Sequence, residues 1–248
     1  MVRLLPPTLL LSLLLGTCAP AQKDLRNYYF PVRELAKEGQ VYAYRQSGTL
    51  PGPAYDHTYY LGVNQDTALY LSVTRYSATN EPVQQSRQRI KNDGAYLEAM
   101  TLAQADTSGR AVLTPTEIKF PKVFPFYHDA AVPQAAGFRI ALTPPAQSET
   151  RQFVSLNRTF GGDTTVTVMG TTYDAIYFDV AGEVSVRDPE NGDISPQFTG
   201  REIYAKGLGL VAYRRDLGAA GTVIGELTKL IPMQKFAERG DPHAGHDH

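Results

Sequence analysis

The stretch Leu69-Tyr-Leu-Ser-Val-Thr-Arg-Tyr76 decides the fold class, because apolar and polar residues alternate along it. Successive side chains of a β-strand point to opposite faces, so Leu69, Leu71 and Val73 would share one face and the intervening residues the other. Strands with one apolar and one polar face are typical of antiparallel sheets. The stretch therefore predicts a half-buried antiparallel strand.

Similar alternation recurs at residues 165–168 and 183–187, and turn signals separate such runs at short intervals. Glycine, asparagine, aspartate and proline favour tight turns between strands. The pattern therefore predicts successive hairpins. The turn signals are Ser47-Gly48, Pro51-Gly52-Pro53, Asn92-Asp93-Gly94, Ser108-Gly109, Gly161-Gly162-Asp163, Asn191-Gly192-Asp193 and Leu217-Gly218.

One hairpin is especially clear, because residues 84–91 and 95–104 can pair around Asn92-Asp93-Gly94.

The sequence contains little evidence for helices. A short helix is expected near residues 32–38, and a second over 226–239 would be interrupted by Pro232, which cannot donate a backbone hydrogen bond.

The first 17 residues are expected to be a signal peptide, not a structural helix. Arg3 precedes an apolar run over residues 4–15, and two small residues then lead to Cys18. The run is too short to cross a bilayer, which takes about 20 apolar residues in a helix.

The sequence Leu15-Gly16-Thr17-Cys18 resembles the bacterial lipobox, in which the cysteine receives a lipid. Cys18 is the only cysteine of the chain, so it cannot form an internal disulfide, and lipidation would account for it. A thiol that merely follows an ordinary secretory signal is the alternative. We expect an exported protein held on a bacterial membrane through lipid on Cys18, either on the outer membrane facing the periplasm or at the cell surface.

The charge balance excludes a nucleic-acid partner. Cleavage before Cys18 would remove one of the 24 basic residues, Arg3, and leave 23 against 25 acidic residues, a formal charge of −2. Nucleic-acid-binding domains carry a clear basic excess.

Both flanks of the expected domain lack the residues that build a core. Residues 18–27 are small and polar for the most part and predict a flexible tether. Residues 237–248 contain no large apolar residue and predict a disordered tail. A single β domain is expected over residues 28–236.

The aromatic segment that follows residue 119 is the candidate ligand-lining element. Prolines recur in residues 114–125 and 133–145, which predicts longer excursions from the sheet because proline cannot donate to a central ladder. The first excursion could plug the sheet or line a cavity. Its candidate ligand-lining residues are Phe120, Phe124, Phe126 and Tyr127.

Histidines suggest two further kinds of site. The tail holds His243, His246 and His248 near two aspartates, a composition that can bind transition metals or can simply be solvated. His57 and His128 each adjoin an aspartate, but neighbours on a strand point to opposite faces, so neither pair is an obvious catalytic dyad.

No catalytic residue can be assigned from a motif. The chain contains no Gly-x-Ser-x-Gly, no Walker loop, no His-Glu-x-x-His and no Cys-x-x-Cys. Gly207-Leu-Gly209 is not a nucleotide loop, since a strand pattern and not a helix follows it. Carboxylate-only hydrolysis leaves no spacing signature. We expect no cofactor.

Three stretches carry a family resemblance. They are Tyr29-Phe30-Pro31-Val32 followed by Gly39 and Tyr42, residues 166–175, and Tyr204-Ala-Lys-Gly-Leu-Gly-Leu-Val211. Together they resemble a group of periplasmic β-sheet proteins related to the lipoprotein-carrier fold. The resemblance implies an open, strongly curved antiparallel sheet over an apolar interior, with a hairpin at 204–211. It supplies no catalytic residue.

The predicted fold is all-β: an extended, strongly curved antiparallel sheet or open half-barrel of about ten strands, with little helix. The predicted function is non-catalytic binding of an apolar ligand or of another envelope protein. The alternatives are a hydrolase that uses carboxylates or His57 and His128, and a metal-handling protein that uses the C-terminal histidines.

Overall fold

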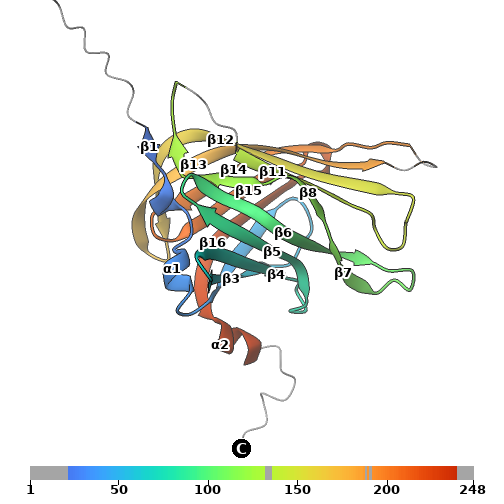
Figure 1. The fold of residues 1–248 in the computed structure, drawn as a ribbon, viewed down its shortest axis with the longest axis horizontal. Coiled ribbons are helices and arrows are strands. Elements are labelled where there is room, and N and C mark those ends of the chain that lie inside the picture. The colour runs from blue at the N-terminus through green and yellow to red at the C-terminus, as the bar shows by residue number, and fades with distance from the viewer. Residues whose placement is uncertain (1–21, 132–135, 188, 190–191, 239–248) are drawn as a thin grey trace, which may run out of the picture.

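Fourteen antiparallel strands form one strongly curved sheet in the computed structural model, which describes residues 22–131, 136–187, 189 and 192–238 (Figure 1). The first five are β2 (Gln40–Gly48), β3 (Tyr55–Gln65), β4 (Ala68–Tyr76), β5 (Pro82–Lys91) and β6 (Gly94–Ala105). Three short strands follow, β7 (Ala111–Pro115), β8 (Glu117–Phe120) and β9 (Lys122–Pro125). The last six are β11 (Ala136–Leu142), β12 (Arg151–Val168), β13 (Thr171–Arg187), β14 (Gln197–Ala205), β15 (Gly209–Asp216) and β16 (Thr222–Pro232).

The strand order turns the sheet into a nearly closed barrel. It runs β7-β6-β5-β4-β3-β2-β16-β15-β14-β13-β12-β11-β8, so the pair β2 and β16 joins the two halves of the chain. Strand β8 pairs with β11 at one end of this order, and the next strand along the chain, β9, pairs with β6 near the other end. The short connection between β8 and β9 therefore brings the two ends of the sheet together. The aromatic excursion expected from sequence is thus the connection that closes the barrel.

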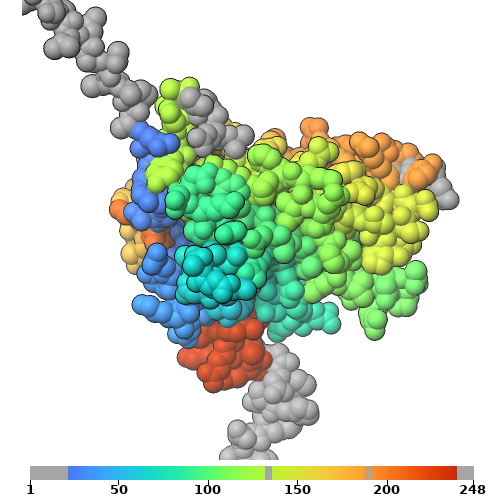
Figure 2. Space-filling view, viewed as in Figure 1, coloured from blue at the N-terminus to red at the C-terminus, as the bar shows by residue number. Residues whose placement is uncertain are grey.

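The remaining elements are small. Strand β1 (Lys23–Asp24) pairs with β10 (Tyr127–His128) in a separate two-stranded sheet. A 3-10 turn, η1 (Arg26–Tyr28), and one helical turn, α1 (Val32–Leu35), precede β2, while η2 (Gly218–Ala220) and α2 (Met233–Glu238) flank β16. Figure 2 shows α2, in red, on the surface beside the part of the described chain that is coloured blue.

Side-chain alternation separates an inner from an outer apolar face. On β2, Tyr42 and Tyr44 belong to the large core inside the barrel, whereas Val41 and Ala43 belong to a small outer cluster that also contains Phe236 of α2. Helix α2 therefore covers the outside of the barrel at β2.

The fold class predicted from sequence is confirmed, including the antiparallel pairing and the curvature. The expected hairpin is present, with Lys91 opposite Gly94 across the turn. The GxG segment is also a hairpin between β14 and β15, as expected.

Three details differ from the sequence-based expectation. The sheet has more strands than about ten, because the proline-containing stretch forms β7, β8 and β9, with its prolines at strand ends or between strands. Residues 226–232 continue β16, and only 233–238 are helical. The fold also begins before residue 28, since Leu25 is fully buried and residues 23–24 form β1.

Candidate ligand-binding cavity

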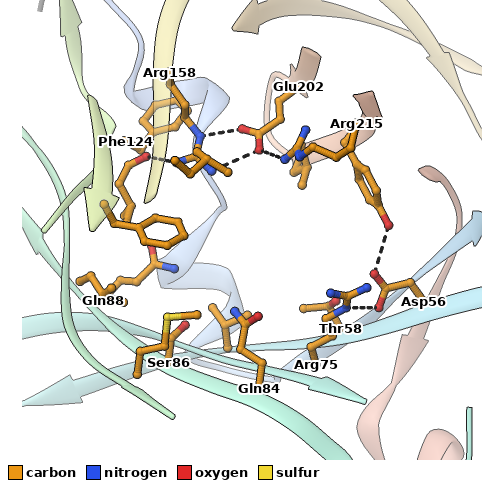
Figure 3. Close-up of a pocket in the computed structure, with 18 of the residues that line it drawn as sticks. Asp56, Thr58, Arg75, Gln84, Ser86, Gln88, Phe124, Arg158, Glu202 and Arg215 are labelled. Atoms are coloured by element: carbon orange, nitrogen blue, oxygen red, sulfur yellow. Dashed lines mark hydrogen bonds and ion pairs between the residues drawn. The ribbon is translucent and has the colours of Figure 1, made fainter. Parts of the chain in front are cut away.

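The inside of the barrel holds a cavity of about 510 Å³ that is partly open to solvent, and its wall is formed by inward-facing side chains from most strands (Figure 3). Ligand-binding cavities in proteins typically measure about 300–1,000 Å³ and are mostly apolar, with a few polar groups that orient the ligand. This cavity has that composition. Its apolar lining includes Val73, Leu97, Met100, Val123, Leu156 and Val184.

Aromatic rings close one end of the cavity. Phe30 stacks on Tyr60 with ring centroids 4.2 Å apart, and Tyr29 packs against Phe124 at 5.1 Å. Phe124 also contacts Tyr204 edge-on, at 5.0 Å. Tyr29 and Phe30 come from the short segment between η1 and α1, so the sequence motif that suggested a family resemblance forms the plug of the barrel.

Backbone contacts hold this plug in place. The amide of Leu25 donates to the carbonyl of Phe126 at 2.8 Å, and the amide of Gly207 donates to the carbonyl of Asn27 at 2.8 Å. Helix α1 lies so close to β3 that a Cβ on Gly62 would be 2.0 Å from the carbonyl oxygen of Val32. Only glycine fits there.

A buried carboxylate organises the polar side of the cavity. Arg158 donates from Nε to Glu202 Oε2 at 2.6 Å and from Nη2 to Oε1 at 3.2 Å, while its Nη1 donates to the carbonyl of Val123 at 2.9 Å. Arg215 also pairs with Glu202 Oε1, and the hydroxyl of Tyr204 donates to Oε2 at 2.8 Å. The Glu202 side chain is only 2% exposed. Every oxygen of this buried carboxylate is therefore satisfied.

The arginines keep Glu202 ionised. Burial alone would raise the pKa of this carboxyl group, but the charges of Arg158 and Arg215 outweigh burial and lower its pKa to about 2. The pKa of Tyr204 is raised by burial and by the neighbouring carboxylate, so its phenol stays protonated and can donate.

A second ion pair lies nearer β3 and β4. Arg75 Nε donates to Asp56 Oδ1 at 2.9 Å, and the hydroxyl of Tyr213 donates to Asp56 Oδ2 at 3.1 Å. Burial and the Asp56 charge raise the pKa of Tyr213 to about 12. The Asp56 side chain is buried, but that of Arg75 is 46% exposed, so solvent reaches this part of the cavity wall.

Neutral polar groups from β5 face the Glu202 cluster, and one of them, Gln84, lies beside Arg75 on the neighbouring strand β4. Figure 3 shows Gln84, Ser86 and Gln88 on the side of the cavity opposite Glu202 and Arg215. Gln88 accepts a hydrogen bond at 2.6 Å from the hydroxyl of Tyr29 in the plug. The interior thus combines apolar and aromatic walls, the amide and hydroxyl groups of β5, and two separate clusters of charged groups.

The structure separates the four aromatic residues proposed from sequence as ligand-lining. Phe124 lines the cavity, and Phe126 packs beside it in the core. Tyr127 lies in β10, where the guanidinium of Arg26 sits 5.3 Å from its ring. Phe120 is 43% exposed and borders a separate, smaller pocket of about 340 Å³.

The two internal histidines lie in different clusters, and neither lines the cavity. His57 packs against Phe236 under α2, with ring centroids 5.1 Å apart. His128 packs against Phe160 at 4.3 Å. Asp56, the neighbour of His57, turns to the inside of the barrel, as strand alternation predicts.

Other predicted sites lie outside the described residues, namely Cys18 and the tail histidines His243, His246 and His248. Among the residues that the structure describes, no cluster of three or more histidine, cysteine, aspartate or glutamate side chains could hold a metal ion. Within the same residues, no helix has the length and apolar character needed to span a membrane.

The charged residues of the cavity were not identified from the sequence, although a signal exists. On β14, Phe198, Glu202 and Tyr204 share the inward face, so a carboxylate stands among apolar positions. On β12, Arg158 lies on the same strand face as the apolar residues Val154 and Leu156. A charged residue on an otherwise apolar strand face marks a buried pair or a site.

Comparisons with known proteins give a fold and no family. No family model matches the chain, and no curated protein matches it. Among solved structures, a candidate lipoprotein from Parabacteroides distasonis superimposes with a TM-score of 0.50 at 14% identity, covering 82% of this chain and 97% of that one. A candidate exported protein with a YmcC-like fold from Bacteroides fragilis gives a TM-score of 0.46 at 13% identity, covering 78% and 95%. The hypothetical lipoprotein YmcC from Escherichia coli gives 0.28 at 11%, covering 80% and 88%. The chain thus shares its fold with the Parabacteroides protein.

Proposed function

We propose that the protein is an exported lipoprotein of the bacterial envelope, anchored through lipid on Cys18, whose barrel binds an apolar small molecule. The observation that carries the binding role is the cavity of about 510 Å³ with apolar walls and a few convergent polar groups. The anchoring role is supported by the lipobox-like sequence before Cys18 and by the shared fold with the candidate lipoprotein of Parabacteroides distasonis. The relationship to the lipoprotein-carrier fold remains a prediction from the sequence.

The arrangement of the interior favours binding over chemistry. Both cavity carboxylates are held in ion pairs, Glu202 with two arginines and Asp56 with Arg75. A general acid or base needs a pKa near the working pH, whereas the pKa of Glu202 is lowered to about 2. A non-catalytic role therefore fits these groups best.

The test is to recover the ligand. Residues 19–248, which contain every described residue, would be exported without Cys18, purified without detergent, extracted with organic solvent and analysed by mass spectrometry. We expect one class of apolar molecule in near-equal amount to protein. The matched control is Ser86→Phe, which fills the cavity from β5 and should reduce the recovered amount. An empty extract from a well-folded protein would contradict the proposal.

A further inference from the structure

The charges that line the cavity do not balance. Its charged residues are Arg75, Arg158, Arg215, Asp56 and Glu202. Three guanidinium groups thus face two carboxylates within the described wall, which leaves a formal excess of one positive charge. An uncompensated charge in a low-dielectric interior is unfavourable, so its persistence needs a counter-ion or solvent.

The excess can be assigned to Arg215. Arg158 takes both oxygens of Glu202 and directs its remaining nitrogen to the carbonyl of Val123, so its charge is matched by that carboxylate. Arg75 is matched by Asp56. Arg215 shares Glu202 through Nη2, its Nη1 donates to the carbonyl of Arg214, and its guanidinium lies 5.6 Å from the centre of the Tyr213 ring, so that within the described residues it has no carboxylate of its own.

The position of Arg215 suits a ligand group. Its side chain is 19% exposed, more than that of Arg158, and Figure 3 shows it at the margin of the open centre of the cavity. Apolar side chains share the cavity wall with it: Val223 lies opposite Arg215 on β16, Leu217 follows at the end of β15, and Leu97 and Met100 belong to β6. An anion at Arg215 would therefore carry an apolar body against these walls.

We propose that the cavity binds an amphiphile with an aliphatic body and one anionic group, and that Arg215 is the residue that recognises the anion. This inference rests on the proposed binding function and adds the class of ligand. A guanidinium group can hold a carboxylate or a phosphate through two parallel hydrogen bonds. Charge-assisted bonds of this kind are stronger than neutral ones, and in a desolvated site the anion should bind much more tightly than an uncharged analogue.

The test compares dodecanoate, dodecyl phosphate and dodecan-1-ol on residues 19–248 by isothermal titration calorimetry. We expect either anion to bind at least about tenfold more tightly than the alcohol, the equivalent of one charge-assisted contact. Which of the two anions binds more tightly shows whether the natural ligand is a fatty carboxylate or a phosphorylated lipid. Arg215→Gln should weaken the binding of both anions and so abolish their preference over the alcohol.

Two variants separate recognition from folding. Arg215→Lys keeps the charge and should retain a weaker preference for the anion. Arg201→Gln is the matched control, because Arg201 neighbours Glu202 on β14 but points outward and pairs with Asp179 at 2.8 Å. The anion site is refuted if the two anions bind no more tightly than dodecan-1-ol, or if Arg215→Gln still binds the anions more tightly than the alcohol. The proposed binding function would stand in either case. If none of the probes binds, the proposed function itself fails.

Discussion

Arg158 holds both carboxylate oxygens of Glu202 inside the barrel, at 2.6 and 3.2 Å, although the two residues are 44 positions apart in the chain. The contact crosses the sheet from β12 to β14, over the intervening β13. It fixes the charged side of the cavity and leaves Arg215 as the second partner of the same carboxylate.

Removing the carboxylate should destabilise the fold strongly. Glu202→Gln leaves Arg158 and Arg215 buried without their counter-charge, and breaking such a pair costs about 3–5 kcal/mol. We expect a loss of this size in the free energy of unfolding, measured by urea denaturation. Asp179→Asn, which breaks the exposed pair with Arg201, should cost less than about 1 kcal/mol. Equal losses for the two variants would contradict the buried role of Glu202.

Stability should depend on acid pH through Glu202. Its pKa is about 2 in the folded protein against an ordinary value of 4.5. A lowered folded-state pKa means that the ionised group contributes stability above pH 4.5, and that this contribution is lost as the pH falls toward 2. We expect the urea midpoint to fall across that window. The Glu202→Gln variant should show a shallower fall, and an unchanged slope would show that other carboxylates dominate.

Truncating Phe124 and truncating Phe120 should have different effects on stability and on ligand binding. Phe124→Ala removes a ring that is 1% exposed and contacts Tyr29 and Tyr204, and such truncations cost about 3–5 kcal/mol. Phe120→Ala should change stability by less than about 0.5 kcal/mol, because that ring is exposed. Phe124→Ala should also alter binding of dodecanoate, whereas Phe120→Ala should not. An effect of Phe120 on binding would place the ligand outside the cavity.

Docking of the plug should depend on Gly62. A Cβ there meets the carbonyl oxygen of Val32 at 2.0 Å and the amide of Ala36 at 2.6 Å, so Gly62→Ala must displace α1. Overpacking of this kind costs about 1–3 kcal/mol. We expect faster amide exchange in residues 25–36 by mass spectrometry. The control is Gly52→Ala, where a Cβ would come within 4 Å of the flexible amide of Gln46 and, apart from the adjacent residues, of no other described group.

Membrane anchoring should require Cys18. Cys18→Ser in the full chain removes the acceptor of the lipid, and the exported protein should move from the membrane fraction to the soluble fraction of the envelope. Metabolic labelling with a radioactive fatty acid should mark the wild type and not the variant. A variant that stays with the membrane would point to another means of attachment.

Metal handling by the tail remains a separate prediction. Deleting residues 240–248 should abolish the binding of copper, nickel and zinc if His243, His246 and His248 hold the metal. Calorimetry of each metal on the full and shortened chains measures this directly. Unchanged binding after the deletion would refute a metal role for the tail.

Local sequence patterns were sufficient to predict the all-β fold class and the position of individual strands and turns. The alternation at Leu69, Leu71 and Val73 specified which side chains turn inward, and Asn92-Asp93-Gly94 specified the turn between β5 and β6, because both depend only on neighbours in the chain. The closure of the barrel and the residues that meet in its interior could be seen only in the folded chain. Pairing of β9 with β6 and of Arg158 with Glu202 joins residues far apart in sequence, and no local preference encodes which distant inward-facing charges will meet.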